Sequence, residues 1–128
     1  MNKEIIARDI NYTAPNAART IIVRNNEYTA GQVFTTQKAE SWESGSSQSF
    51  KCENDWGKEL TFICADLPCH KVDYDNDEEV EILNAHEHEA EVLVPAGTTF
   101  KVTSVSTDGD YEEMGYYEVV LEFISNEN

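Results

Sequence analysis

The stretch Glu89-Ala90-Glu91-Val92-Leu93-Val94-Pro95-Ala96-Gly97-Thr98-Thr99-Phe100-Lys101-Val102 decides the expected fold of this chain. Its two carboxylates, Glu89 and Glu91, precede an apolar run that turns at Pro95-Ala96-Gly97 and resumes as a second strand. In an extended strand, residues i and i+2 point to the same face, so both carboxylates are expected to lie side by side. Such a pair can carry acid–base chemistry or stabilise a cation. The competing interpretation is a solvated strand edge in an acidic chain.

Length and charge limit the classes of protein that remain. The chain has 128 residues, three cysteines and a net charge of −16. This length predicts a single compact domain spanning 1–128. The acidic charge disfavours binding to nucleic acid or to an anionic membrane and suits a basic protein partner. The sequence shows no signal-peptide core and no apolar run of about 18 residues, and an odd cysteine count favours a reducing compartment, so we expect a cytoplasmic protein.

Short β-type segments dominate the chain. Strands are predicted at Thr20–Arg24, Gln32–Thr36, Glu59–Ala65, Val92–Val94, Phe100–Val105 and Tyr116–Ile124. Helical patterning is confined to residues 5–10 and to a single turn at 16–19. Residues 66–72 are expected to leave the strand that precedes them, and the acidic segment 73–81 is expected to be exposed. The pattern predicts an α+β, mainly β domain of two packed sheets with little N-terminal helix.

Metal ligation and thiol chemistry are weakly supported. The candidate nitrogen and sulfur ligands considered as a group are Cys64, Cys69, His70, His86 and His88. Their spacing matches no paired-cysteine zinc motif, and core and loop roles are the simpler interpretation. The Asp73-x-Asp75-x-Asp77 spacing starts like a calcium loop, but the sixth and twelfth positions are Glu78 and Asn84 instead of Gly and Glu. We therefore expect no metal site.

The order of several functional candidates along the chain matches the order in a known family of enzymes. A strand ends in Arg24, a short strand leads to a loop centred on Ser41, and Phe50 follows before the next core strand. The Glu-x-Glu motif at residues 89–102 comes last. In this order and in that motif, the chain resembles mono-ADP-ribosyltransferases of the Arg–Ser–Glu class, found in bacterial toxins and phages. The family's catalytic segment runs Glu-x-Glu or Gln-x-Glu, Val-Leu-hydrophobic-Pro, a glycine turn and Phe-hydrophobic-Val, and the resemblance extends over residues 20–124.

The resemblance implies a role for each of these residues, with NAD as substrate bound in a cleft between the sheets. Glu91 is expected to be the catalytic glutamate that holds the ribose 2′-hydroxyl and stabilises the oxocarbenium ion. Glu89 is expected to orient the acceptor, and Glu at this position implies an arginine of a protein target. Arg24 is expected to contact the NAD phosphates. Ser41 resembles the first serine of the family's Ser-Thr-Ser element, which positions the catalytic glutamate.

The physical chemistry of these roles is consistent. Loss of nicotinamide leaves positive charge on the anomeric carbon, so a fixed carboxylate stabilises the transition state more than the ground state. A guanidinium binds a pyrophosphate in a bidentate manner. An aromatic residue such as Phe50, Trp42 or Tyr28 is a candidate to stack on nicotinamide or adenine, although buried aromatics are core residues by default.

Three alternatives remain open from the sequence. The Ser-Thr-Ser element is placed at Ser41-Trp42-Glu43, but Thr35-Thr36-Gln37 is a rival placement. The chain is alternatively a non-catalytic, acidic protein-binding inhibitor, of the kind phages encode, that docks through residues 73–81 and 112–122. The third alternative is a domain that kept the ADP-ribosyltransferase fold and lost its activity.

Overall fold

The computed structural model describes residues 2–44, 57–84 and 91–126. Seven strands and three short helices follow one another along the chain: α1 (Lys3–Ala7), β1 (Tyr12–Val23), β2 (Val33–Thr35), β3 (Glu40–Ser44), β4 (Lys58–Lys71), α2 (Asp77–Leu83), β5 (Glu91–Val94), β6 (Thr98–Val105), α3 (Asp108–Met114) and β7 (Tyr117–Asn126). The expected mainly β architecture with little N-terminal helix is confirmed over these residues.

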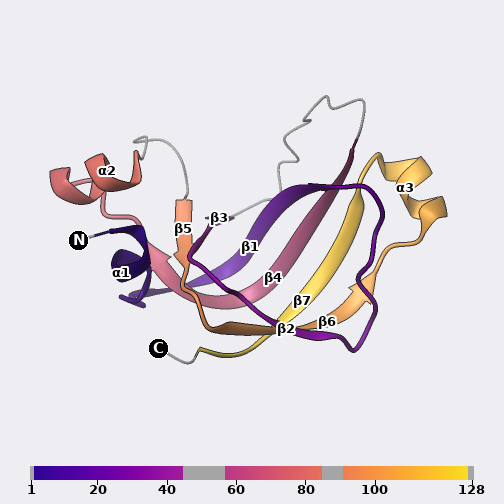
Figure 1. The fold of residues 1–128 in the computed structure, drawn as a ribbon, viewed down its shortest axis with the longest axis horizontal. Coiled ribbons are helices and arrows are strands. Elements are labelled where there is room, and N and C mark those ends of the chain that lie inside the picture. Colours follow the sequence, from indigo (N-terminus) through magenta and orange to yellow (C-terminus); the bar gives the residue numbers. More distant parts are fainter. Residues whose placement is uncertain (1, 45–56, 85–90, 127–128) are drawn as a thin grey trace.

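Hydrogen bonds join the seven strands into one sheet, instead of the two separate sheets expected from the sequence. Its order is β1-β3-β5-β4-β7-β6-β2, and β1 also pairs with β4. β4 pairs with β1, β5 and β7, so it connects the strands β1, β3 and β5 on one side of the sheet to the strands β7, β6 and β2 on the other. Figure 1 shows long, curved strands, with α1 and α2 at one end of the molecule and α3 at the other.

The two longest strands extend well beyond their predicted bounds. The helical turn expected at residues 16–19 is part of β1, and residues 66–71, expected to leave the strand, continue β4. The register between these strands skips Pro15 and Asp66. Proline has no amide hydrogen to donate, and Asp66 takes a left-handed φ of 51°. This local irregularity lets both strands continue past residues that sequence reasoning treats as strand breakers.

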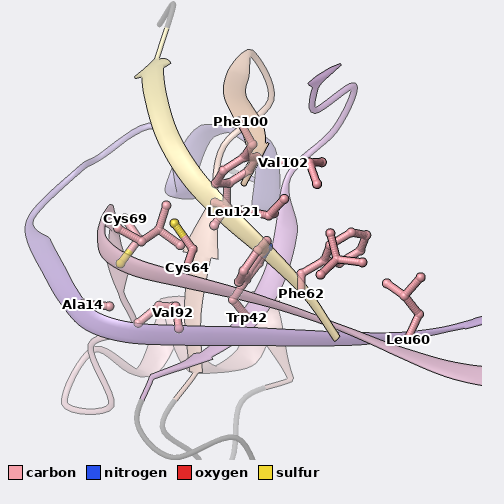
Figure 2. Packing of buried hydrophobic residues seen from close by; sticks show 14 of the residues in the cluster. Ala14, Trp42, Leu60, Phe62, Cys64, Cys69, Val92, Phe100, Val102 and Leu121 are labelled. Atoms are coloured by element: carbon pink, nitrogen blue, oxygen red, sulfur yellow. The ribbon is translucent and has the colours of Figure 1, made fainter. Parts of the chain in front are cut away.

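Aromatic rings fill the main core. Trp42 from β3 is 2% exposed and stacks on Phe100 from β6, with ring centroids 5.5 Å apart. Phe62 from β4 meets the ring of Tyr28 edge to face at 5.2 Å. Figure 2 shows Trp42, Phe62 and Phe100 pointing into the same interior. Large buried rings dominate the energetics of such a core, because each removes a large apolar area from water.

A smaller apolar cluster attaches α1 to the sheet. It consists of Ile6, Ala7, Ala39, Val72 and Leu93. The carboxylate of Glu4 also accepts the Ala39 N–H, at 2.8 and 2.7 Å to its two oxygens. The helix is therefore held against the residue that precedes β3.

The acidic segment 73–81 differs from its prediction at one residue. Most of it is exposed, as expected, but Glu79 is 8% exposed and contacts His70. Among the described residues, no group of three or more His, Cys, Asp or Glu side chains is arranged to hold a metal ion. No helix in the same residues is long and apolar enough to cross a membrane.

Candidate active site

Strand register brings Ser41 and Glu91 together. β3 and β5 are antiparallel, with Glu43 opposite Glu91 and Ser41 opposite Leu93. Because directly opposed residues and residues two apart share a face, the side chains of Ser41, Glu43 and Glu91 project from the same side of the sheet. The Ser41 hydroxyl donates a hydrogen bond to Glu91 Oε1 at 3.0 Å. The structure thus joins the two residues that the sequence analysis linked functionally.

A lysine that the sequence analysis missed extends this contact. Lys3 Nζ donates to Ser41 Oγ at 2.9 Å. The two residues are 38 positions apart, and the sequence around Lys3 contains no motif. Only the packing of α1 against the start of β3 brings the ammonium to the serine. The result is a chain of two hydrogen bonds, from Lys3 through Ser41 to Glu91.

The opposite face of β3 carries a structural ion pair. Arg19 Nη1 lies 3.0 Å from Glu40 Oε2, and the indole N–H of Trp42 donates to Glu40 Oε1 at 3.2 Å. Burial raises the pKa of the Tyr28 hydroxyl, and the nearby charge of Arg19 opposes that shift. Trp42 and Tyr28, both considered as stacking residues for NAD, are therefore part of the core and its polar border.

Arg24 lies at a different place. It follows the last residue of β1, is exposed, and lines an open cavity of about 420 Å³ together with Val23, Asn25, Glu27, Tyr28 and Gln32. Across the sheet, the level of Glu91 corresponds to Ala18 of β1, through Glu43. Arg24 is six residues further along, which is roughly 20 Å in an extended strand. The structure does not bring Arg24 into contact with Ser41 and Glu91.

The remaining predicted site residues are outside the described part of the chain. Glu89 and Phe50 fall in the segments 85–90 and 45–56, as do His86 and His88 in the first of these. Cys64 and Cys69 are buried, and burial raises the pKa of Cys64 to about 11. A thiol that stays protonated at neutral pH is a poor nucleophile and a poor metal ligand.

Comparison with solved structures shows which proteins share the fold of this chain. No protein-family model and no curated protein matches the chain. Among solved structures, the Vis toxin, an ADP-ribosyltransferase from Vibrio splendidus, superposes with a TM-score of 0.54 at 15% identity, over 89% of this chain and 49% of that one. Vis in complex with agmatine gives a TM-score of 0.55 at 16% identity, over 89% and 50%. The type III effector XopAI from Xanthomonas axonopodis pv. citri gives 0.58 at 13% identity, over 91% and 44%.

These similarities define the class of fold. The described residues form the fold of ADP-ribosyltransferases, as the motif at residues 89–102 led us to expect. The chain spans about half the length of the structures that it matches.

Proposed function

We propose that this protein is an NAD-dependent mono-ADP-ribosyltransferase that modifies a protein side chain. The observation that carries the proposal is the hydrogen bond from Ser41 to Glu91, at the entrance of β5, in a chain with the fold of ADP-ribosyltransferases. A carboxylate oriented by a serine at the start of a rigid strand is suited to stabilise a cation that develops beside it. The proposed setting is that of a toxin or phage effector.

The proposed reaction breaks the bond between nicotinamide and the ribose of NAD. Nicotinamide leaves as a neutral molecule with the bonding electrons, and the anomeric carbon becomes cationic. Since Ser41 donates to Glu91 Oε1, Oε2 remains to accept the ribose 2′-hydroxyl, and the carboxylate charge stabilises the cation. The acceptor nitrogen then attacks the anomeric carbon, and Glu89 takes the proton that the acceptor loses.

An arginine acceptor is part of the proposal. Glu89 in place of glutamine supplies a second carboxylate, which pairs with a guanidinium through two parallel hydrogen bonds. One of the similar structures is Vis in complex with agmatine, which carries a guanidinium group. The net charge of −16 also suits a basic target protein. We propose that the encounter takes place in the cytoplasm of the producing or the target cell.

Arg24 and Phe50 are proposed to hold the rest of the NAD molecule. Arg24 lines an open cavity, and its guanidinium is suited to a pyrophosphate. For one NAD molecule to reach both Arg24 and Glu91, it must lie extended along β1, since the two residues are roughly 20 Å apart along the strand direction. Phe50 is proposed to stack on one of the aromatic rings of NAD.

Release of nicotinamide from labelled NAD tests the proposal. Glu91→Gln keeps the shape of the side chain and removes its charge, so the rate is expected to fall by about a hundred- to a thousand-fold. Glu112→Gln, on the exposed surface of α3 at the other end of the molecule, is the matched control and is expected to keep the wild-type rate. Equal rates for wild type and Glu91→Gln, both folded by circular dichroism, would remove Glu91 from the chemistry.

The acidic surface leaves one non-catalytic alternative. α2 and α3 both begin with acidic residues, but Figure 1 places these helices at opposite ends of the molecule. Residues 112–122 extend from α3 into β7, so α2 and α3 cover only part of the expected docking surface. Binding of a basic partner through that surface would be insensitive to Glu91→Gln.

A further inference from the structure

We propose that Lys3 is a positioning residue of this active site, which acts through Ser41 to hold the Glu91 carboxylate in its working orientation. The inference rests on the proposed function and extends it to a helix that the sequence analysis gave no role. It concerns the orientation of a charged group, and Lys3 itself is not proposed to touch the substrate.

The donors along this chain have a defined order. A lysine ammonium only donates, so Ser41 Oγ must accept the bond from Lys3 Nζ at 2.9 Å. The single hydroxyl proton of Ser41 is then directed to Glu91 Oε1, at 3.0 Å. Without the ammonium, the hydroxyl is free to rotate toward other acceptors or water. Lys3 thereby keeps the serine proton on the carboxylate.

α1 places the lysine firmly enough for this task. The side chain of Asn2 caps the helix by accepting the Ile5 N–H at 3.0 Å. Ile6 and Ala7 are buried against the sheet. Next to Lys3, Glu4 binds the Ala39 amide with both carboxylate oxygens. The cap stabilises the helix itself. Apolar packing and the hydrogen bonds between Glu4 and Ala39 are the two kinds of contact that fix the helix at the start of β3, two residues away from Ser41.

The charges around the site favour a cation here. Glu43 is directly opposite Glu91 in the ladder and on the same face of the sheet. Two carboxylates in that position repel each other unless nearby cations or donors offset their charge. Arg19, the arginine of the neighbouring strand, is paired with Glu40 on the opposite face of β3. The ammonium of Lys3 adds positive charge on the face where Glu91 needs it.

Kinetics of nicotinamide release from NAD separate this role from a merely structural one. In Lys3→Met, kcat is expected to fall about ten- to a hundred-fold, because a small misplacement of a catalytic group has effects of that size, while KM for NAD changes less than two-fold. Lys3→Arg retains a cationic donor and is expected to recover most of kcat. Lys101→Met, which removes an exposed lysine from β6, is the charge-matched control and is expected to behave as wild type.

The contrary outcomes are equally specific. Unchanged kcat in Lys3→Met overturns the inference, even if Glu91→Gln is inactive and the proposed function stands. A loss in Lys3→Met that Lys3→Arg does not recover, or one that appears in KM alone, assigns Lys3 to folding or to binding and also overturns it.

A double-mutant cycle tests the contact if the wild-type protein releases no nicotinamide. In urea unfolding, Lys3→Met and Glu91→Gln are combined, and their effects on the unfolding equilibrium constant are compared with the effects of each alone. A coupling of roughly two- to five-fold is expected for an exposed charged network of this kind and supports the positioning contact. Independent effects of the two substitutions overturn it.

Discussion

The imidazole of His70 and the carboxyl group of Glu79 meet in the interior, between β4 and the acidic helix α2. His70 Nδ1 lies 2.8 Å from the carbonyl oxygen of Asp9. A carbonyl only accepts, so Nδ1 carries a proton. The bond between Nε2 and Glu79 Oε1 then needs one further proton, carried by the ring or by the carboxyl group. Glu79 Oε1 also accepts the Asp73 N–H at 3.3 Å, so this pair ties α2 and the residues after α1 to β4.

Removing the carboxyl group should therefore cost stability. Glu79→Ala leaves a buried imidazole nitrogen and the Asp73 amide without their partner, and it is expected to lower the free energy of unfolding by about 2–4 kcal/mol. Urea unfolding followed by circular dichroism measures the change. Glu78→Ala, on the exposed side of the same helix, should stay within about 0.5 kcal/mol of wild type. Equal midpoints for both variants would contradict this account.

The local signals of β5 and β6 were readable from the sequence. Val92–Val94 is an apolar run of strand type, and Gly97, with φ of 87°, supplies the turn that separates it from Phe100. The Thr98 hydroxyl completes the turn by donating to the Pro95 carbonyl at 2.7 Å. These features depend on residues that are close together in the sequence. For that reason the motif at residues 89–102, the most specific in the chain, was enough to predict the fold.

The pairing of strands that are far apart in the sequence could not be predicted from the sequence. Pro15 and Asp66 are typical of strand ends, so the predicted strands stopped short of them. In the structure β1 and β4 pair with each other on both sides of these residues, and the energy of that pairing overrides local propensity. Lys3 escaped notice for the same reason, because only tertiary packing brings it to Ser41. Conversely, the sequence order of Arg24 and Glu91 did not reveal how far apart the strand places them.

Loss of the Ser41 hydroxyl should weaken catalysis more than binding. In Ser41→Ala the Glu91 carboxylate loses the hydrogen bond at Oε1, so kcat for nicotinamide release is expected to fall about ten-fold or more, with KM for NAD nearly constant. Ser41→Thr keeps the hydroxyl and is expected to retain most activity. A rise in KM without a change in kcat would instead indicate that Ser41 contacts NAD itself.

Arg24→Gln tests whether the cavity beyond β1 holds the NAD phosphates. A charge-assisted bidentate bond is worth about 1.5–3 kcal/mol, so KM for NAD is expected to rise roughly ten- to a hundred-fold. Lys101→Gln removes the same charge from an exposed site on β6 and should leave KM unchanged. Isothermal calorimetry of NAD binding gives the same comparison without turnover. Identical affinities for Arg24→Gln and wild type would show that Arg24 does not bind the NAD phosphates.

Burial should protect two thiols from alkylation. Cys64 and Cys69 are buried in the core, and burial raises the pKa of both. In a Cys52→Ser background, which leaves only these two, iodoacetamide at pH 8 is expected to label neither in the native protein and both in urea, because the thiolate is the reacting species. Mass spectrometry counts the adducts. Rapid labelling of the native protein would show that the core around β4 opens readily.

The buried thiol of Cys64 is expected to lower the stability of the folded protein at high pH. Cys64 has its pKa raised by burial from the ordinary 9.0 to about 11 in the folded protein. Between these values the unfolded chain releases the thiol proton and the native protein retains it, so deprotonation favours unfolding. The contribution is complete below about pH 9 and is lost as the pH rises toward 11. Wild type should therefore lose about 1.5–2 kcal/mol more stability than Cys64→Ala between pH 8.5 and pH 10.5 in urea unfolding. Other titrating groups act on both proteins alike, and parallel pH profiles would mean that the native thiol titrates as it does in the unfolded chain.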